Sequence, residues 1–215
     1  MKLKLNIPET LEEITLEKYQ EYATLIKDNP DSEFTRQKTI EIFCGVDLKS
    51  LLQISISDVN SISEHLNNLF TTKPDLSIEI DINGTRFGFI PNLENMSYGE
   101  FIDLDEYLKD VSTWHNAMAV LYRPITNRIK QLYSIEQYET SEKYAEQMKR
   151  LPFSIAYGAV LFFYDLRNEL LNASMDYLEK LQPQQKEDLA QRFNLPNGGD
   201  GLVQYMRSQM EILQN

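Results

Sequence analysis

Residues 87–124 read FGFIPNLENMSYGEFIDLDEYLKDVSTWHNAMAVLYRP. A strand ends at Pro91, a short loop follows, and a helix rich in aromatic and acidic side chains comes next. Ser97 followed by Glu100 has the spacing of a capping box, in which two side chains satisfy free N–H groups at the start of a helix. The stretch contains no arrangement typical of a catalytic centre, so it predicts a strand-to-helix unit and no active site.

The residues just before this stretch predict a β-hairpin. Segments 76–82 and 85–90 flank Asn83-Gly84, a pair that suits a type I′ turn because both central positions need a positive φ. A two-stranded hairpin is marginally stable alone. Residues 2–7 alternate apolar and polar side chains, so we expect them to supply a third strand. The sequence thus predicts a small, mostly antiparallel sheet.

The rest of the chain has helical periodicity, which makes the expected fold α+β and predominantly α-helical. We expect Gly45 to end one helix and Gly158 to lie where a helix packs closely on a neighbour. The last long helix, 153–181, is apolar on nearly every side of its first half, which is typical of a buried central helix. Helices are expected at residues 15–27, 33–44, 47–52, 57–70, 97–107, 112 or 113–122, 125–133, 141–150 and 153–181, with a short one at 187–193.

A change of composition near residue 182 predicts two parts. Residues 1–181 are expected to form one mostly helical α+β domain, and residues 182–215 a polar, Gly-rich linker with a C-terminal amphipathic helix. Residues 196–201 hold three of the eight glycines and suggest a hinge. The terminal helix either folds back onto the body or reaches a partner, and we expect it to be detachable.

Charge and composition restrict the class of protein. The chain has 215 residues, and its net charge of −12 comes from 33 acidic and 21 basic residues, so we expect no nucleic-acid partner. Cys44 is the only cysteine, which excludes an internal disulfide. No charged-then-apolar leader opens the chain, and its longest apolar run, 159–164, is too short to span a bilayer. We therefore expect a cytosolic protein without a membrane partner.

The polar residues favour neither a metal site nor an enzyme. His65 and His115 fall on different helices and have no second ligand at metal-binding spacing. Helical spacing brings carboxylates together by chance, so the acidic residues at 94–110 are interpreted as a solvated face of a helix. Arg123 lies at the end of the next helix and is expected to pair with a carboxylate at 103–110. We expect no enzymatic activity and no cofactor. A remote alternative is a carboxylate-dependent metal enzyme that uses Glu100, Asp103 and Glu106.

Several blocks of the chain carry a resemblance to a known group of proteins. The blocks are ITLEKYQ (14–20), GFIPNL (88–93), MSYGEFIDL (96–104), HNAMAVLYRPI (115–125), YETSE (138–142), LP (151–152) and AYGAVLFF (156–163). Together they resemble small proteins encoded by tailed bacteriophages, namely tail-assembly chaperones or minor virion components. The resemblance covers about residues 1–180, and it implies no catalytic residue.

The resemblance implies a bacteriophage morphogenesis protein that acts through protein–protein contacts, with tail assembly as the favoured step. The alternative is a structural protein retained in the virion, in the tail, connector or head. The expected partners are other phage structural or tail proteins, with homo-oligomerisation as a further option, and the expected location is the host cytoplasm during assembly or the virion. The candidate partner-binding residues are Tyr98, Phe101, Asp103, Tyr107, Val203, Met206 and Met210.

Overall fold

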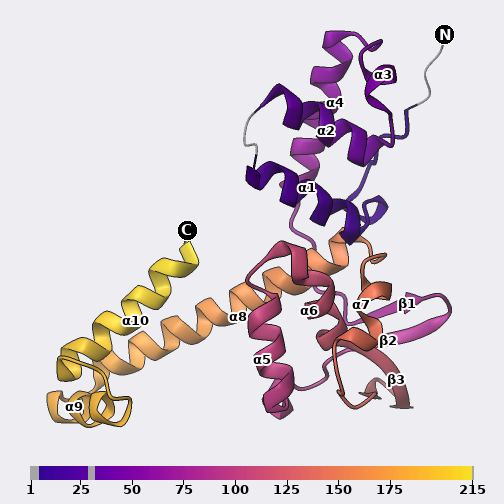
Figure 1. Cartoon of the computed structure of the whole chain (residues 1–215). Helices are drawn as coiled ribbons and strands as arrows, with labels where there is room; N and C mark the ends of the chain where they lie inside the picture. Colours follow the sequence, from indigo (N-terminus) through magenta and orange to yellow (C-terminus); the bar gives the residue numbers. More distant parts are fainter. Residues whose placement is uncertain (1–4, 29–31, 215) are drawn as a thin grey trace. The chain divides into compact units, whose positions relative to one another are not determined.

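The computed structural model describes residues 5–28 and 32–214 and is 63% helical with 12% strand. This composition confirms the predicted α+β, predominantly helical fold. The chain divides into two compact units, Met1–Val160 and Leu161–Asn215. Figure 1 labels their helices and the strands β1, β2 and β3. That residues 1–181 fold as one domain stays a prediction.

Four helices open the first unit, and α2, α3 and α4 begin at side-chain caps. Ser32, Asp47 and Ser55 each accept a hydrogen bond from a backbone N–H three residues later. Gly45 has a φ of 63° and ends the second helix, as predicted. The elements are the 3-10 turn η1 (Leu11–Glu13), α1 (Leu16–Asp28), α2 (Glu33–Cys44), α3 (Leu48–Leu51) and α4 (Ile56–Phe70).

An aromatic cluster joins these helices to the start of the long helix α8 (Phe153–Lys180). The rings of Tyr19 and Phe153 stack with centroids 3.7 Å apart, and Phe43 lies 5.1 Å from both Tyr22 and Phe70. A backbone hydrogen bond also joins the segment before α1 to the first residue of α8, because the Phe153 N–H donates to the carbonyl of Ile14 at 2.7 Å. Burial raises the pKa of Tyr19 to about 12.

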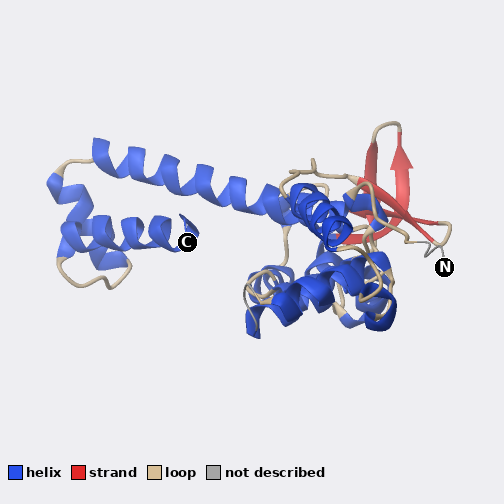
Figure 2. Cartoon of the chain, turned by 90° about the horizontal axis from the view of Figure 1, so that it is seen from above, coloured by secondary structure: helices blue, strands red, loops and turns tan. Residues whose placement is uncertain are grey.

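The sheet has four antiparallel strands in the order β1-β2-β3-β4 (red in Figure 2). Asn83 and Gly84 have φ values of 53° and 80°, which confirms the predicted hairpin turn. The third strand pairs with β2 at its start and with β4 further along. The strands are β1 (Glu79–Ile82), β2 (Thr85–Phe89), β3 (Tyr122–Ile129) and β4 (Leu132–Ile135).

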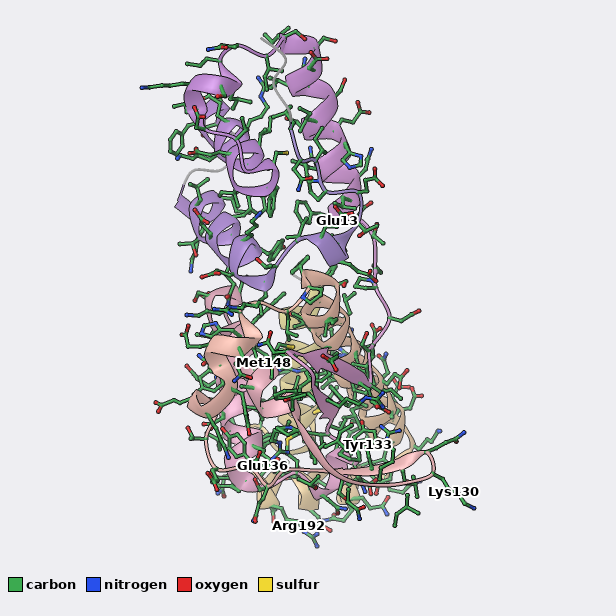
Figure 3. The ribbon with its side chains drawn as sticks, turned by 90° about the vertical axis from the view of Figure 1, so that its right-hand side faces the viewer. Glu13, Lys130, Tyr133, Glu136, Met148 and Arg192 are labelled. Atoms are coloured by element: carbon green, nitrogen blue, oxygen red, sulfur yellow. The ribbon has the colours of Figure 1, made fainter. Side chains whose placement is uncertain are left out.

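Two expectations about the sheet are wrong. Residues 5–7 form no strand, and residues 2–4 lie outside the described residues; the third strand is β3. Residues 125–133, expected to be helical, belong to the β3–β4 hairpin. Their apolar positions have helical spacing, but the β-branched side chains of Ile125, Thr126 and Ile129 suit a strand, and pairing between β3 and β4 supplies the hydrogen bonds. Figure 3 labels Lys130 at the tip of this hairpin.

Three further helices pack beside the sheet. Helix α6 is the most buried of them, and its residues Ala117–Leu121 are at most 1% exposed. It leads directly into β3, where the fully buried Tyr122 donates a hydrogen bond to the carbonyl of Ser77 at 2.7 Å. The elements are η2 (Leu93–Asn95), α5 (Tyr98–Tyr107), η3 (Val111–Thr113), α6 (Trp114–Leu121) and α7 (Glu142–Met148).

Helix α8 is buried only over its first turns. Ala156, Ala159 and Val160 are at most 3% exposed, whereas Leu161 and the residues just after it are half-buried. A Cβ on Gly158 would lie 2.5 Å from the carbonyl oxygen of Asp75, so this glycine allows the close packing that the sequence predicts. The expectation of a buried first half thus holds as far as Val160.

The second unit contains the end of α8, α9 (Pro183–Arg192) and α10 (Gly198–Gln214). Leu178, Ala190 and Leu202 form its buried core, one residue from each helix. The expected hinge at 196–201 is wrong, because Gly198 begins α10. The N–H of Gly199 donates to the carboxylate of Glu187 at 3.0 Å, and a Cβ on Gly201 would lie 1.7 Å from the carbonyl oxygen of Pro196. These glycines are therefore packing positions.

Gly88→Ala is expected to destabilise the first unit. A Cβ at residue 88 would lie 2.3 Å from a ring carbon of Tyr133. The Tyr133 hydroxyl donates to the carbonyl of Phe89 at 2.8 Å and lies 3.0 Å from the carbonyl oxygen of Ile78. Displacing this ring is expected to cost about 1–3 kcal/mol of unfolding free energy, measured by urea denaturation.

The control is Gly99→Ala, because the nearest atom to its Cβ is a ring carbon of Tyr138 at 4.0 Å. Alanine also favours a helix more than glycine does, so this variant is expected to match or exceed the wild type in stability. Equal stability of Gly88→Ala and the wild type would show that the Tyr133 ring does not lie against residue 88.

Candidate functional site

Helix α5 has a buried side and an exposed apolar side. Leu104 and Glu100 are 5% and 6% exposed, whereas Tyr98, Phe101 and Ile102 are 79%, 59% and 45% exposed. Positions i, i+3 and i+4 lie on one face of a helix, so these three side chains form one patch. We call Tyr98, Phe101 and Ile102 the α5 outer face.

The buried side of α5 is held by an ion pair between Glu100 and Arg123 of β3. Both residues are 6% exposed, and the Arg123 guanidinium donates a hydrogen bond to the Glu100 carboxylate. The same carboxylate accepts the N–H of Ser97 at 2.6 Å, and Glu100 N–H donates to the Ser97 hydroxyl, which confirms the predicted capping box. Arg123 was expected to pair with a carboxylate at 103–110; its partner is Glu100, three residues earlier than that range.

Opposing effects set the charge of Glu100. Burial raises the pKa of its carboxyl, but the hydrogen bonds from Ser97 and the charge of Arg123 outweigh burial and hold the pKa below its ordinary value. The cation also lies over the ring of Tyr138, with the guanidinium carbon 5.5 Å from the ring centroid. Within the described residues, the Arg123 Nε has no hydrogen-bond partner.

Asp103 and Tyr107 do not belong to the α5 outer face. The hydroxyl of Tyr138 donates to the carboxylate of Asp103, and the hydroxyl of Ser141 donates to that of Tyr107 at 3.2 Å. Burial, with the nearby Asp103 carboxylate, raises the pKa of Tyr138. Both side chains therefore fasten the segment between β4 and α7 to α5.

The sequence did not predict that the segment between β4 and α7 anchors α5 through Tyr138 and Ser141. Glu136, labelled in Figure 3, accepts a hydrogen bond from the Tyr144 hydroxyl at 2.5 Å and pairs with Lys143. The only signal in the sequence is the presence of tyrosines among charged residues, and these occur equally on solvated surfaces.

The candidate residues of the terminal helix contact their own unit. Met206 packs against the core formed by Leu178, Ala190 and Leu202. Val203 lines a cleft of about 410 Å³ together with Met175, Lys186 and Arg207. The side chain of Met210 lies outside the described residues. Of the two outcomes left open for this helix, the described residues therefore show the fold-back, against α9 and the end of α8.

The three carboxylates proposed as an alternative metal site have separate partners. Glu100 pairs with Arg123, Asp103 accepts from Tyr138, and Glu106 pairs with Lys109 at 3.0 Å. Among the side chains of residues 5–28 and 32–208, no group of three His, Cys, Asp or Glu could hold a metal ion. The described geometry therefore does not support the metal-enzyme alternative.

His115 and Cys44 are two other potentially reactive side chains; the first contacts Gln20 and the second is buried. The amide of Gln20 lies 3.0 Å from His115 Nδ1, and burial, followed by the charge of Lys149, lowers the pKa of this histidine. Burial raises the pKa of the Cys44 thiol to about 11, so it stays protonated at neutral pH. Neither residue has the surroundings of a nucleophile.

A second cleft lies in the first unit and has a volume of about 300 Å³. Lys27 and Asp110 form an ion pair at 3.3 Å there, and both side chains are at least half exposed. Hydrogen bonds from Ser112 and Lys27 lower the pKa of Asp110 to about 2. The cleft is lined by Ala23, Thr24, Lys27, Lys109, Asp110, Val111 and Ser112.

Comparison with known protein families, curated proteins and solved structures found no match. In the part of the chain that the structure describes, no helix is long and apolar enough to cross a membrane. The resemblance to tailed-bacteriophage proteins therefore stays a prediction from the sequence.

Breaking the Glu100–Arg123 pair is expected to cost more stability than breaking a surface pair. Arg123→Met leaves a buried carboxylate without its cation, a change that typically costs about 3–5 kcal/mol. The double variant Glu100→Gln/Arg123→Met is expected to recover part of this loss. Lys109→Met, which removes the exposed partner of Asp105 and Glu106, serves as the control and is expected to change little. Equal unfolding free energies for Arg123→Met and Lys109→Met would contradict the importance of the buried pair.

The stability difference between the wild type and Arg123→Met is expected to shrink in acid. The folded-state pKa of Glu100 lies below its ordinary value of 4.5, so ionised Glu100 stabilises the wild type above that pH. This contribution is lost as the pH falls through the folded-state pKa. In the variant, protonation instead relieves an unpaired buried charge. Urea unfolding from neutral pH to about pH 3 measures both curves, and a constant difference would contradict this assignment.

Proposed function

We propose that this chain acts in bacteriophage morphogenesis by binding another phage protein, with tail assembly as the step. One support is the sequence resemblance over about residues 1–180. The observation that carries the proposal is the α5 outer face, where three large apolar side chains lie exposed on one helix. Exposed aromatic residues contribute rigid contact area at protein interfaces.

The α5 outer face suits recognition because its support is rigid. The capping box fixes the first turn of α5, and the Glu100–Arg123 pair fixes the opposite side of the helix to β3. Asp103 and Tyr107 add the segment between β4 and α7. A patch held in this way loses little conformational entropy on binding.

The surrounding charge is consistent with a binding protein. Asp105 and Glu106 lie next to the patch and are 58% and 71% exposed in their side chains, and the whole chain carries a net charge of −12. Net charge of this size keeps a protein soluble while it exposes apolar side chains. A partner with an apolar surface bordered by basic residues would complement this site.

Tyr98→Ala/Phe101→Ala is expected to reduce binding of the partner without unfolding the chain. In cells infected with the phage that encodes this protein, the tagged wild type is expected to co-purify with a tail protein identified by mass spectrometry. The double variant is expected to recover at least about tenfold less of it, since interface aromatics often contribute more than 1.4 kcal/mol each.

Leu52→Ala/Ile56→Ala is the matched control, because these side chains are 72% and 76% exposed but lie outside α5. Equal loss of partner binding in both variants, or no loss in either, would contradict the assignment to the α5 outer face.

Mass spectrometry of purified phage particles separates a tail-assembly chaperone from a retained virion protein. Absence from particles supports a chaperone that leaves before maturation, and stoichiometric presence supports the alternative of a retained virion protein.

A further inference from the structure

The chain contains two Asn-Gly pairs, Asn83-Gly84 and Asn197-Gly198. An asparagine in such a pair can react with its own backbone: the nitrogen of the glycine attacks the side-chain carbonyl carbon, and ammonia leaves. Glycine permits this attack because it has no Cβ to obstruct it. Both asparagines are exposed and have a positive φ, 53° at Asn83 and 67° at Asn197. Exposure and backbone conformation therefore do not separate the two sites, but their hydrogen bonds do.

At Asn83, the N–H that would react is already engaged. The N–H of Gly84 donates to the carboxylate of Asp81 at 2.9 Å, and pairing of Ile82 with Thr85 closes the hairpin. The attack requires this nitrogen to lose its proton. A hydrogen bond to an anion holds the proton in place, and the negative charge opposes the nitrogen anion that would form. The hairpin turn therefore protects Asn83.

At Asn197, which lies in the turn between α9 and α10 (Figure 1), the N–H that would react is free. Gly198 is the first residue of the 17-residue helix α10, and none of the described residues accepts its N–H. The positive end of the helix dipole stabilises a negative charge at this nitrogen. The carbonyl of Asn197 accepts the N–H of Gly201 at 3.2 Å, which polarises the same peptide group. Both effects ease the loss of the proton.

One carboxylate near this site acts in the opposite direction. Glu187 accepts the N–H of Gly199 at 3.0 Å, and its charge disfavours an anion at the neighbouring nitrogen. The N–H that it holds is one residue beyond the reacting one, so no hydrogen bond has to break before Gly198 reacts. This differs from the hairpin, where Asp81 holds the reacting N–H itself.

We propose that Asn197 is a site of spontaneous covalent modification in the folded protein. The Gly198 nitrogen gives up its proton and bonds to the side-chain carbonyl carbon of Asn197. The amide group of the side chain takes a proton and leaves as ammonia, which produces a succinimide ring. Water then opens the ring at either carbonyl, so the products are aspartate and isoaspartate. One water is consumed and one ammonia is released, and nothing is oxidised or reduced.

The isoaspartate product alters the packing of the second unit. It adds one methylene to the main chain between residues 197 and 198, where the backbone is closely packed. A Cβ on Gly201 would lie 1.7 Å from the carbonyl oxygen of Pro196. Leu202 follows directly and belongs to the buried core of the unit, so a longer turn displaces it. The modification therefore loosens the second unit slowly and irreversibly as the protein ages.

The test of the site is storage of the full chain at mildly alkaline pH, followed by digestion and mass spectrometry, which locates each converted amide. Modification is expected to be at least about tenfold faster at Asn197 than at Asn83, because a hydrogen bond to a charged group must first break at Asn83. Asp81→Ala is the matched variant, since it frees the Gly84 N–H and is expected to raise the rate at Asn83 alone. Equal or slower modification at Asn197, or an unchanged rate at Asn83 in Asp81→Ala, would overturn the proposal.

The structural consequence is tested with Asn197→Gly, because glycine removes the reacting amide and accepts the positive φ of this position. The stored wild type is expected to lose protection of its backbone amides against hydrogen exchange over residues 178–208, whereas stored Asn197→Gly keeps it. Circular dichroism of fresh samples establishes that each variant is folded. Equal loss of protection in both stored proteins would overturn the proposed loosening. Since no phage partner is involved, failure here leaves the proposed function standing.

Discussion

The ion pair between Glu100 and Arg123 is the interaction on which the sheet-and-helix part of the first unit depends. The Glu100 carboxylate completes the capping box of α5 and also pairs with Arg123, which lies at the start of β3 directly after α6. Burying two opposite charges rarely adds much stability over an apolar pair, but it penalises every arrangement that separates them. The pair therefore selects one packing of α5 against β3 and, through Tyr138, one path for the segment after β4.

The two sides of helix α5 have different roles. On its inner side, polar contacts of Glu100, Asp103 and Tyr107 surround the buried Leu104. On its outer side, Tyr98, Phe101 and Ile102 are exposed beside Asp105 and Glu106. Most surface helices bury their apolar side, whereas α5 exposes more large apolar side chains than it buries. A helix built in this way makes sense when another protein covers its outer side, which is the physical reason why the α5 outer face supports a binding function.

Features of the fold that depend on a few neighbouring residues could be predicted from the sequence. The Ser97–Glu100 capping box, the Asn83-Gly84 turn and the Gly45 helix end are of this kind. Residues 125–133 were predicted to be helical because their apolar spacing fits a helix, whereas in the structure they pair within the β3–β4 hairpin. Distant residues hold that hairpin in place, since the Tyr133 hydroxyl lies against the carbonyls of Ile78 and Phe89. The same limit applies to the site: helical spacing alone could not separate Tyr98 and Phe101 from Asp103 and Tyr107. That separation depends on Tyr138 and Ser141, which lie more than thirty residues away.

The packing of α10 has a consequence for any shortened form of the chain. Composition marks residues 196–201 as a natural place to truncate the protein, yet the glycines there begin a helix that lies on α9. A chain that stops at Asn197 loses Leu202 and Met206, and Leu178 and Ala190 then face water. Exposed apolar cores drive aggregation. The glycine-rich segment is thus a poor cleavage point, and a fragment that ends within α8 itself, before Met175, would leave less apolar surface uncovered.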